Sequence, residues 1–141
     1  MATFNSNLIA TNTPAKMGVY PLCAQGNVAV PASTTFALND TIPLCNIGIG
    51  TYLAGVAIDV PILGTTITLT LRDTQGTPVT YITATNKGQA GGIITMADFN
   101  VRGSTGTVYT VPSVLQLVAA AAGGSAVGPV TINFILTWAS I

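Results

Sequence analysis

The stretch Thr66-Ile67-Thr68-Leu69-Thr70-Leu71-Arg72 alternates polar and apolar residues without a break. A second stretch, Val130-Thr131-Ile132-Asn133-Phe134-Ile135-Leu136-Thr137-Trp138, does the same, except that Ile135 falls among the outward positions. A period of two in stretches rich in β-branched residues is the pattern of a half-buried antiparallel strand. Both stretches therefore predict strands with threonine-rich outer faces and apolar inner faces.

Further strands are predicted on both sides of these two. Tyr52–Val60 alternates over its whole length, and weaker candidates are Asn27–Val30, Thr34–Leu38, Thr41–Ile47, Val79–Ala84, Gly92–Ala97, Val108–Val111 and Val114–Ala121. Clusters of Gly, Asn, Asp and Pro separate them, as in turns. Nine or ten strands at a spacing of roughly ten residues predict an all-β, antiparallel β-sandwich or jelly-roll-like single domain.

The helix candidate of the chain is Val114–Ala122, because alanine favours helices. Its Val-Leu-Gln-Leu-Val portion alternates, however, and Gly123-Gly124 follows at once. A strand is therefore the preferred interpretation here too, and no helix is expected elsewhere.

Two parts of the chain differ in character. Residues 1–18 are polar and aperiodic, with isolated apolar anchors at Phe4, Leu8, Ile9 and Met17. This composition fits an extended N-terminal arm that docks on another surface, and it also fits a frayed terminus. Residues 19–141 form the predicted β-sandwich domain.

The chain has 141 residues, a formal net charge of zero and only 6% charged residues. A soluble domain usually has about 25%. It contains no His and no Glu, and its acids and bases are Asp40, Asp59, Asp73, Asp98, Lys16, Arg72, Lys87 and Arg102. Four scattered bases do not supply the cationic surface that nucleic-acid binding requires. General acid–base, metal and triad chemistry depend on the missing residue types or on clustered Asp, so we expect neither an enzyme nor a cofactor.

The most apolar window, Ile42–Leu63, is long enough to cross a bilayer of about 30 Å. It contains Pro43, Asn46, Asp59 and Pro61, and its second half alternates. A buried strand pair therefore explains this window better than a membrane span, and we expect no membrane association.

The two cysteines, Cys23 and Cys45, allow one disulfide bridge or a pair of small buried thiols. Buried thiols are the preferred interpretation, because nothing in the sequence indicates an oxidising compartment. Two thiolates do not complete a structural zinc site.

Two glycine-containing segments invite a ligand interpretation. Gly88-Gln89-Ala90-Gly91-Gly92 lacks the following helix and the Gly-Lys-Ser/Thr ending of a phosphate loop, and Asp73-Thr74-Gln75-Gly76 lacks the repeated Asp/Asn of a calcium loop. We expect hydrogen-bonded turns at both.

Aromatic residues offer a possible sugar platform. Trp138 shares its row with core residues of the last strand. The four tyrosines fit a core or interface better than a glycan site because they are spread over four elements: Tyr20, Tyr52, Tyr81 and Tyr109.

A flat, neutral, threonine-rich surface lacks the charges that usually protect strand edges. The outward Ile135 and the Ala119–Ala122 run add apolar surface that the core of a single chain would not bury. Both features are typical of a subunit of a closed oligomer or a lattice.

Several segments, in this order, resemble the small head decoration (capsid cement) proteins of tailed bacteriophages: Asn7–Asn12, Asp40–Leu44, Gly55–Val60, Ile67–Leu71, Gly88–Gly92 and Val130–Trp138. The Asn-Leu-Ile-Ala-Thr-Asn opening and the Gly-Gln-Ala-Gly-Gly turn carry most of the resemblance. It implies a β-sandwich that binds the exterior of an expanded icosahedral capsid in many copies and stabilises it.

The partner that the resemblance implies is the major capsid protein, with the chain itself a homo-oligomer, most simply a trimer. The expected contact residues combine the arm with the outward isoleucine: Phe4, Asn7, Leu8, Ile9, Asn12, Met17 and Ile135. Alternative functions are another virion component (a tail, spike or head-fibre domain) or a carbohydrate-binding β-sandwich module.

Overall fold

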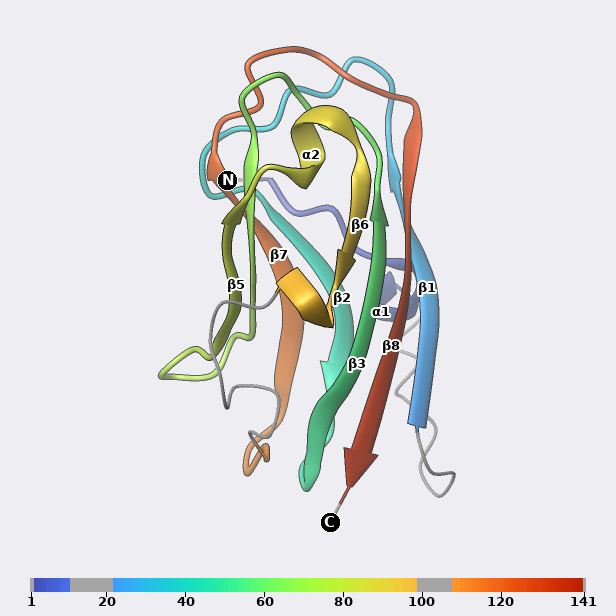
Figure 1. The fold of residues 1–141 in the computed structure, drawn as a ribbon, viewed down its shortest axis with the longest axis vertical. Helices are drawn as coiled ribbons and strands as arrows, with labels where there is room; N and C mark the ends of the chain where they lie inside the picture. Colours follow the sequence, from blue (N-terminus) through green and yellow to red (C-terminus); the bar gives the residue numbers. More distant parts are fainter. Residues whose placement is uncertain (1, 11–21, 99–107, 141) are drawn as a thin grey trace.

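A computed structural model of the chain describes residues 2–10, 22–98 and 108–140. Two four-stranded antiparallel sheets, ordered β1-β8-β3-β6 and β2-β7-β4-β5, pack face to face (Figure 1). The strands are β1 (Leu22–Val30), β2 (Thr41–Ile47), β3 (Thr51–Val60), β4 (Thr68–Arg72), β5 (Thr80–Thr85), β6 (Gly92–Thr95), β7 (Ser113–Ala121) and β8 (Val130–Ser140). Eight strands in this order make a jelly roll, which confirms the predicted fold class.

The alternation of the two defining stretches sets the core. In β8 the buried residues are Ile132, Phe134, Leu136 and Trp138, while Thr131, Asn133 and Ile135 face outward. In β4, Leu69 and Leu71 are buried between half-buried outward residues. Burial of one row per strand on both sheets produces a single continuous hydrophobic core.

Two predicted strands are absent from the described residues, so the sandwich has eight strands rather than nine or ten. Within Thr34–Leu38, only Thr34 pairs, through an isolated bridge to Val127. The chain then turns through Asn39, whose φ is 70°, and the Asp40 carboxylate accepts the backbone N–H of Ala37 at 2.9 Å. This turn takes the place of a strand.

The other predicted strand, Val108–Val111, pairs through a single residue. Tyr109 donates its backbone N–H to Thr51 O and accepts the N–H of Gly50, at 2.9 and 2.7 Å. Pro112 follows and has no N–H to continue a ladder. The pairing therefore stops before a strand forms.

Three short helical segments were not expected from the sequence: α1 (Asn7–Ala10), α2 (Lys87–Ala90) and the 3₁₀ turn η1 (Met96–Asp98). Ser6 starts α1, because its hydroxyl accepts the backbone N–H of Ile9 at 3.2 Å, as an N-cap residue does. The predicted extended conformation of the arm thus holds for residues 2–6 and gives way to a helical turn at Asn7.

The segment expected as a Gly-Gln-Ala-Gly-Gly turn contains α2. Gly88 fits there because a Cβ on it would lie 2.9 Å from Ile67 Cγ2. Gln89 holds the turn to the neighbouring loop by donating from Nε2 to Ile67 O at 2.9 Å, and Gly91, with φ of 78°, ends it. A close approach between backbone and core therefore explains the glycines, with no phosphate needed.

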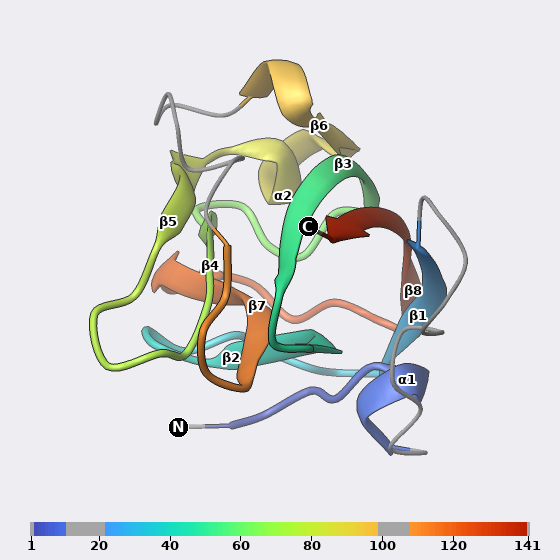
Figure 2. The same ribbon diagram turned by 90° about the horizontal axis from the view of Figure 1, so that it is seen from below.

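The helical segments lie on the two flanks of the sandwich (Figure 2). On one flank α1 contacts β1 and β2, which are the edge strands of the two sheets. On the other, α2 contacts β4 and β6. Among the described residues, no helix is both long and apolar enough to span a membrane.

The N-terminal segment, residues 2–10, docks along the free edge of β2. Backbone hydrogen bonds of 2.8–2.9 Å join Thr41 N to Ala2 O, Phe4 N to Thr41 O, and Ser6 N to Pro43 O. The segment thereby covers polar groups that an edge strand would otherwise present to other chains.

Candidate interaction surface

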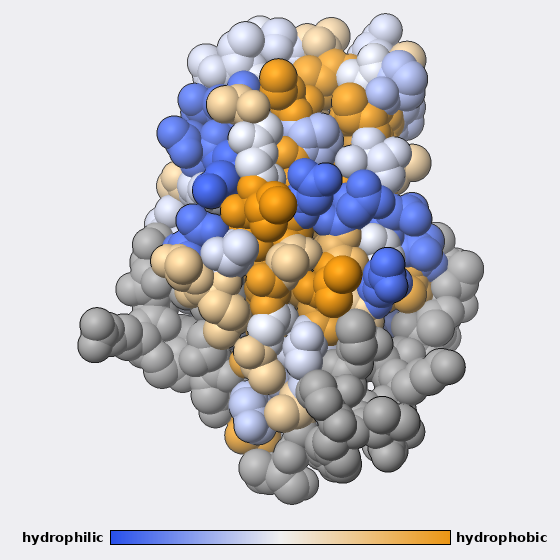
Figure 3. Space-filling model, turned by 45° about the vertical axis from the view of Figure 1, so that its right-hand side comes forward, coloured by the Kyte–Doolittle hydropathy of each residue, from blue (hydrophilic) through white to orange (hydrophobic). Residues whose placement is uncertain are grey.

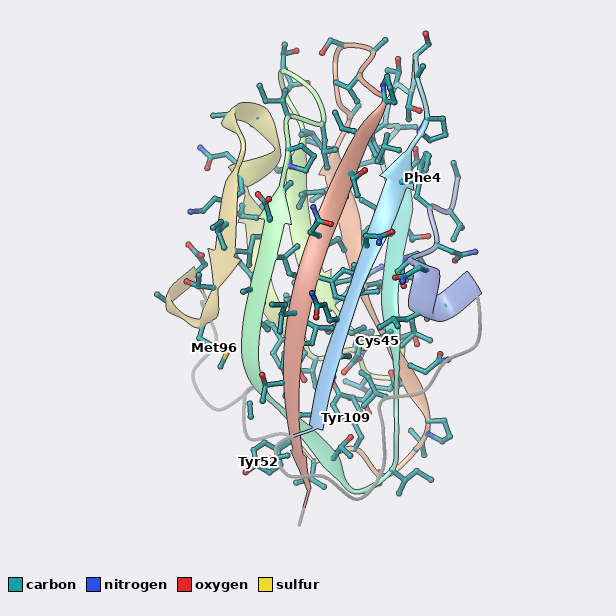
Figure 4. All side chains as sticks on the ribbon, turned by 90° about the vertical axis from the view of Figure 1, so that its right-hand side faces the viewer. Phe4, Cys45, Tyr52, Met96 and Tyr109 are labelled. Carbon is teal, nitrogen blue, oxygen red and sulfur yellow. The ribbon has the colours of Figure 1, made fainter. Side chains whose placement is uncertain are left out.

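The residues expected to contact a partner separate into two groups in the structure. Phe4, Leu8 and Ile9 are half-buried on their own chain, and the Phe4 ring centroid lies 4.8 Å from that of Phe36. Phe4 lies on the flank of the sandwich at the start of β2, where its backbone N–H donates to Thr41 O at 2.8 Å (Figure 4). Asn7 and Ile135 are exposed and line one surface groove. The remaining two, Asn12 and Met17, lie outside the described residues.

This groove, here called the outer groove, lies on the outer face of the β1-β8-β3-β6 sheet and encloses about 320 Å³. Figure 3 looks onto this side of the molecule, where hydrophobic and hydrophilic residues lie next to one another. The residues that line the outer groove come from all four strands of this sheet and from α1: Asn7, Gln25, Gly26, Asn27, Ala57, Asp59, Ile93, Asn133, Phe134 and Ile135. The groove therefore depends on strands that are distant in sequence.

Strand register arranges the lining in two rows across the sheet. One row runs Gln25, Ile135, Ala57, and the neighbouring row runs Asn27, Asn133, Asp59, Ile93. The first row ends in Ala57, whose small side chain leaves room beside the larger Ile135. The result is a polar row flanked by two aliphatic side chains, since Ile93 is 53% exposed and Ile135 46% exposed.

Asn7 joins the rim of the outer groove through a specific contact. Its side-chain Oδ1 accepts the backbone N–H of Asn27 at 2.8 Å. Gly26 makes room for this, because a Cβ on it would lie 2.6 Å from Asn7 Oδ1 and 2.7 Å from the ring of Phe134. The N-terminal segment is thus part of the wall of the groove.

The four acids occupy different environments. Asp40 caps a turn, and Asp98 accepts the backbone N–H of Thr95 at 2.8 Å and lies 3.7 Å from Lys87 Nζ. Asp73 is fully buried. Asp59 is exposed, and among the described residues it makes no hydrogen bond or ion pair. It is therefore the acid that remains available to a partner.

Asn7 and Ile135, which were predicted from the sequence as contact residues, both line this groove, whereas the polar row was not predicted. A signal was present in Asp59 and Asn133, because each occupies an outward position of an alternating strand. Their adjacency follows from β3 lying beside β8, and strand order is not encoded in the alternation itself. For that reason the groove could not be predicted from the sequence alone.

A buried polar network lies at the opposite sheet. The Asp73 carboxylate accepts the Tyr109 hydroxyl at 2.6 Å, and the Tyr81 hydroxyl lies 2.6 Å from that of Tyr109. Asp73 also accepts the backbone N–H groups of Val79 and Gln75, at 3.0 and 3.3 Å. The predicted side-chain-to-backbone turn at Asp73 is confirmed, and Tyr81 and Tyr109 are confirmed as core residues.

The tyrosines and Cys45 lose acidity through burial. Burial raises the pKa of Tyr81 from 10.0 to about 12, despite the opposing hydrogen bond to Tyr109. Burial and the hydrogen bond to Asp73 raise the pKa of Tyr109 well above its ordinary range. Cys45 is a free, buried thiol, and burial raises its pKa from 9.0 to about 12. These groups are inert structural parts of the core near neutral pH.

We expect the folded state to lose stability as pH rises from about 9 to 12. The unfolded chain releases the Cys45 and Tyr81 protons at lower pH than the folded chain does, so alkali favours unfolding. The shift of Cys45, from 9.0 to about 12, corresponds to about 4 kcal/mol over this range, at about 1.4 kcal/mol per pKa unit.

Thermal unfolding followed by circular dichroism from pH 7 to 11.5 measures this effect. A Cys45→Ala variant is the matched control, because it should show a shallower decline than the wild type. Equal melting temperatures at pH 7 and pH 11 would contradict the expectation.

The described residues contain no group of three His, Cys, Asp or Glu placed to hold a metal ion. What the surface offers is an array of amides, one carboxylate and two aliphatic side chains. Amides, a carboxylate and aliphatic side chains are groups that form hydrogen bonds and apolar contacts at protein interfaces.

Comparison with known proteins shows which solved structures share this fold. No protein-family model matches the chain, and no curated protein matches it significantly. Among solved structures, a chain of the capsid of Ralstonia phage GP4 is similar with a TM-score of 0.77 over 99% of both chains, at 16% identity. A chain of the cyanophage Pam1 capsid asymmetric unit is similar with a TM-score of 0.55 over 88% of this chain and 89% of that one, at 21% identity. At these identities the likeness establishes a shared jelly-roll fold.

Proposed function

We propose that this protein is a structural component of a phage head that binds the outer surface of the icosahedral capsid and stabilises the expanded shell. The observation that carries the proposal is the end-to-end match to a chain of a phage capsid, over 99% of both chains. The shared fold therefore extends over almost the whole of both compared chains. The sequence resemblance to head decoration proteins supports the same function independently.

The surface chemistry fits a stabilising ligand of a large assembly. A protein that binds only the expanded shell stabilises it by roughly RT ln(1 + [L]/Kd) per site, with no need of a reaction. A surface with few charges loses little to charge repulsion when many copies lie close together. A trimer, which we propose as the bound form, would add multivalency at capsomer junctions.

The copy number of this chain relative to the major capsid protein in purified particles tests the proposal. We expect hundreds of copies, near a simple ratio to capsid subunits, because a lattice-bound protein repeats with the lattice. A few copies would instead indicate a tail, spike or vertex component. Absence from particles would overturn the virion function and favour a carbohydrate-binding module. Light scattering at micromolar concentration tests the trimer separately.

A further inference from the structure

Building on the proposed function, we infer that the outer groove is the capsid-binding site and that it receives an extended segment of the capsid protein with one Lys or Arg side chain. The segment lies across the polar row, with its cation at Asp59 and apolar side chains against Ile93 and Ile135. The partner chemistry follows from three properties of the groove.

The first property is an unengaged carboxylate in an unfavourable place. Asp is among the residues most depleted from strands, yet Asp59 lies within β3, an interior strand of its sheet. It makes no hydrogen bond or ion pair with the described residues, and none of the described residues that line the groove is basic. The described lining therefore carries one uncompensated negative charge, and a single cation is its complement.

The second property is the row of amides beside this charge. Among the described residues, the side chains of Gln25, Asn27 and Asn133 form no hydrogen bonds. Each amide offers both donors and an acceptor, the combination that a peptide backbone requires. Four strands span about 14 Å at roughly 4.8 Å per strand, which matches about four residues of extended chain.

The third property distinguishes a protein segment from a sugar. Exposed aliphatic side chains gain most by packing against other apolar side chains. Ile93 ends the polar row on β6, and Ile135 lies on β8 in the neighbouring row. Sugars stack on exposed aromatic faces, but the aromatic residue that lines this groove, Phe134, is only 2% exposed. The lining therefore suits a peptide better than a glycan.

Capsids that lack this chain, mixed with purified variants and sedimented, test the inference. Asn133→Arg fills the centre of the groove and Asp59→Lys reverses its charge, so we expect each to weaken binding about 100-fold. Asp59→Asn keeps the shape and should weaken binding about tenfold. The matched control is Thr68→Arg on the outer face of the other sheet, which should bind within about twofold of the wild type.

Salt gives a second readout that a structural defect would not reproduce. Raising ionic strength should weaken the wild type more than Asp59→Asn, because only the wild type has a charge pair to screen. Circular dichroism of each variant verifies folding.

The outcomes separate this inference from the function on which it rests. If the wild type binds capsids and Asn133→Arg binds equally well, the groove assignment is wrong and the decoration function stands. A wild type that does not bind capsids overturns both. If the wild type is retained on a neutral glycan column and Asn133→Arg is not, the ligand of the groove is a carbohydrate and the inferred protein segment is wrong.

Discussion

Replacing Asp73 with alanine is expected to lower the free energy of unfolding by about 4 kcal/mol. The carboxylate accepts hydrogen bonds from Tyr109, Val79 and both the backbone and the side chain of Gln75, at 2.6–3.3 Å. Without it, the buried Tyr109 hydroxyl loses the acceptor of its proton and the Val79 N–H is unpaired. Each buried polar group left unsatisfied costs about 1–3 kcal/mol.

Urea unfolding followed by circular dichroism measures this loss, and the variant's melting temperature should fall by roughly 12 °C. Asp59→Ala is the matched control, since it removes an exposed carboxylate that holds nothing in the described structure and should change stability by less than about 0.5 kcal/mol. Tyr109→Phe should give an intermediate loss, because the backbone donors keep their acceptor. If Asp73→Ala and Asp59→Ala unfold at the same urea concentration, the network contributes nothing.

Deletion of residues 1–10 is expected to destabilise the fold by about 3 kcal/mol, whether or not these residues also contact a capsid. The segment packs Phe4 on Phe36 and fills the space above Gly26. Ser6 is fully buried, and its hydroxyl donates to Leu44 O. Deletion therefore uncovers core and the edge of β2 together.

Thermal unfolding of the truncated chain measures the loss of stability, with Asn5→Ala in the full chain as the control at an exposed position of the same segment. A truncated chain with wild-type stability would show that the segment does not contribute to the fold. Capsid binding by a full-length Phe4→Ala variant then separates weakened packing from a lost contact, because that variant keeps the Asn7 wall of the outer groove.

Much of the fold could be predicted because the alternation in β4 and β8 indicates directly which side chains are buried. In β3 the alternation over Tyr52–Val60 predicted the wrong face for the first residues, because the pairing register shifts between Leu53 and Gly55 and leaves Leu53, rather than Tyr52 and Ala54, buried. Thr41–Ile47 was predicted with its observed bounds. The local alternation of residues failed to predict strands correctly where backbone pairing depends on a segment that is distant in the sequence. Tyr109 reads as part of a strand, but it pairs only with the turn at Gly50 and Thr51. No helix was predicted over Asn7-Leu8-Ile9-Ala10, because four residues are too few to show the apolar period of a helix.

The candidate surface was predictable only in fragments. The outward position of Ile135 follows from two-residue alternation, and it lines the groove. Its neighbours Gln25, Asp59 and Ile93 come from strands that the jelly-roll crossovers bring together, so no local signal links them. Phe4 and Leu8 were expected to contact a partner because they are apolar in a polar segment, and that property equally suits their packing on the chain's own core.

The strand-like run of residues 2–6 along β2 bears on how assembly is timed. A threonine-rich sheet with an open edge would be free to pair with other copies of the chain. The chain covers the edge of β2 itself, so under the proposed function free subunits would not pair along this edge before expanded shells are present. Under the proposed function, maturation of the head, and not the supply of this protein, then decides when reinforcement begins.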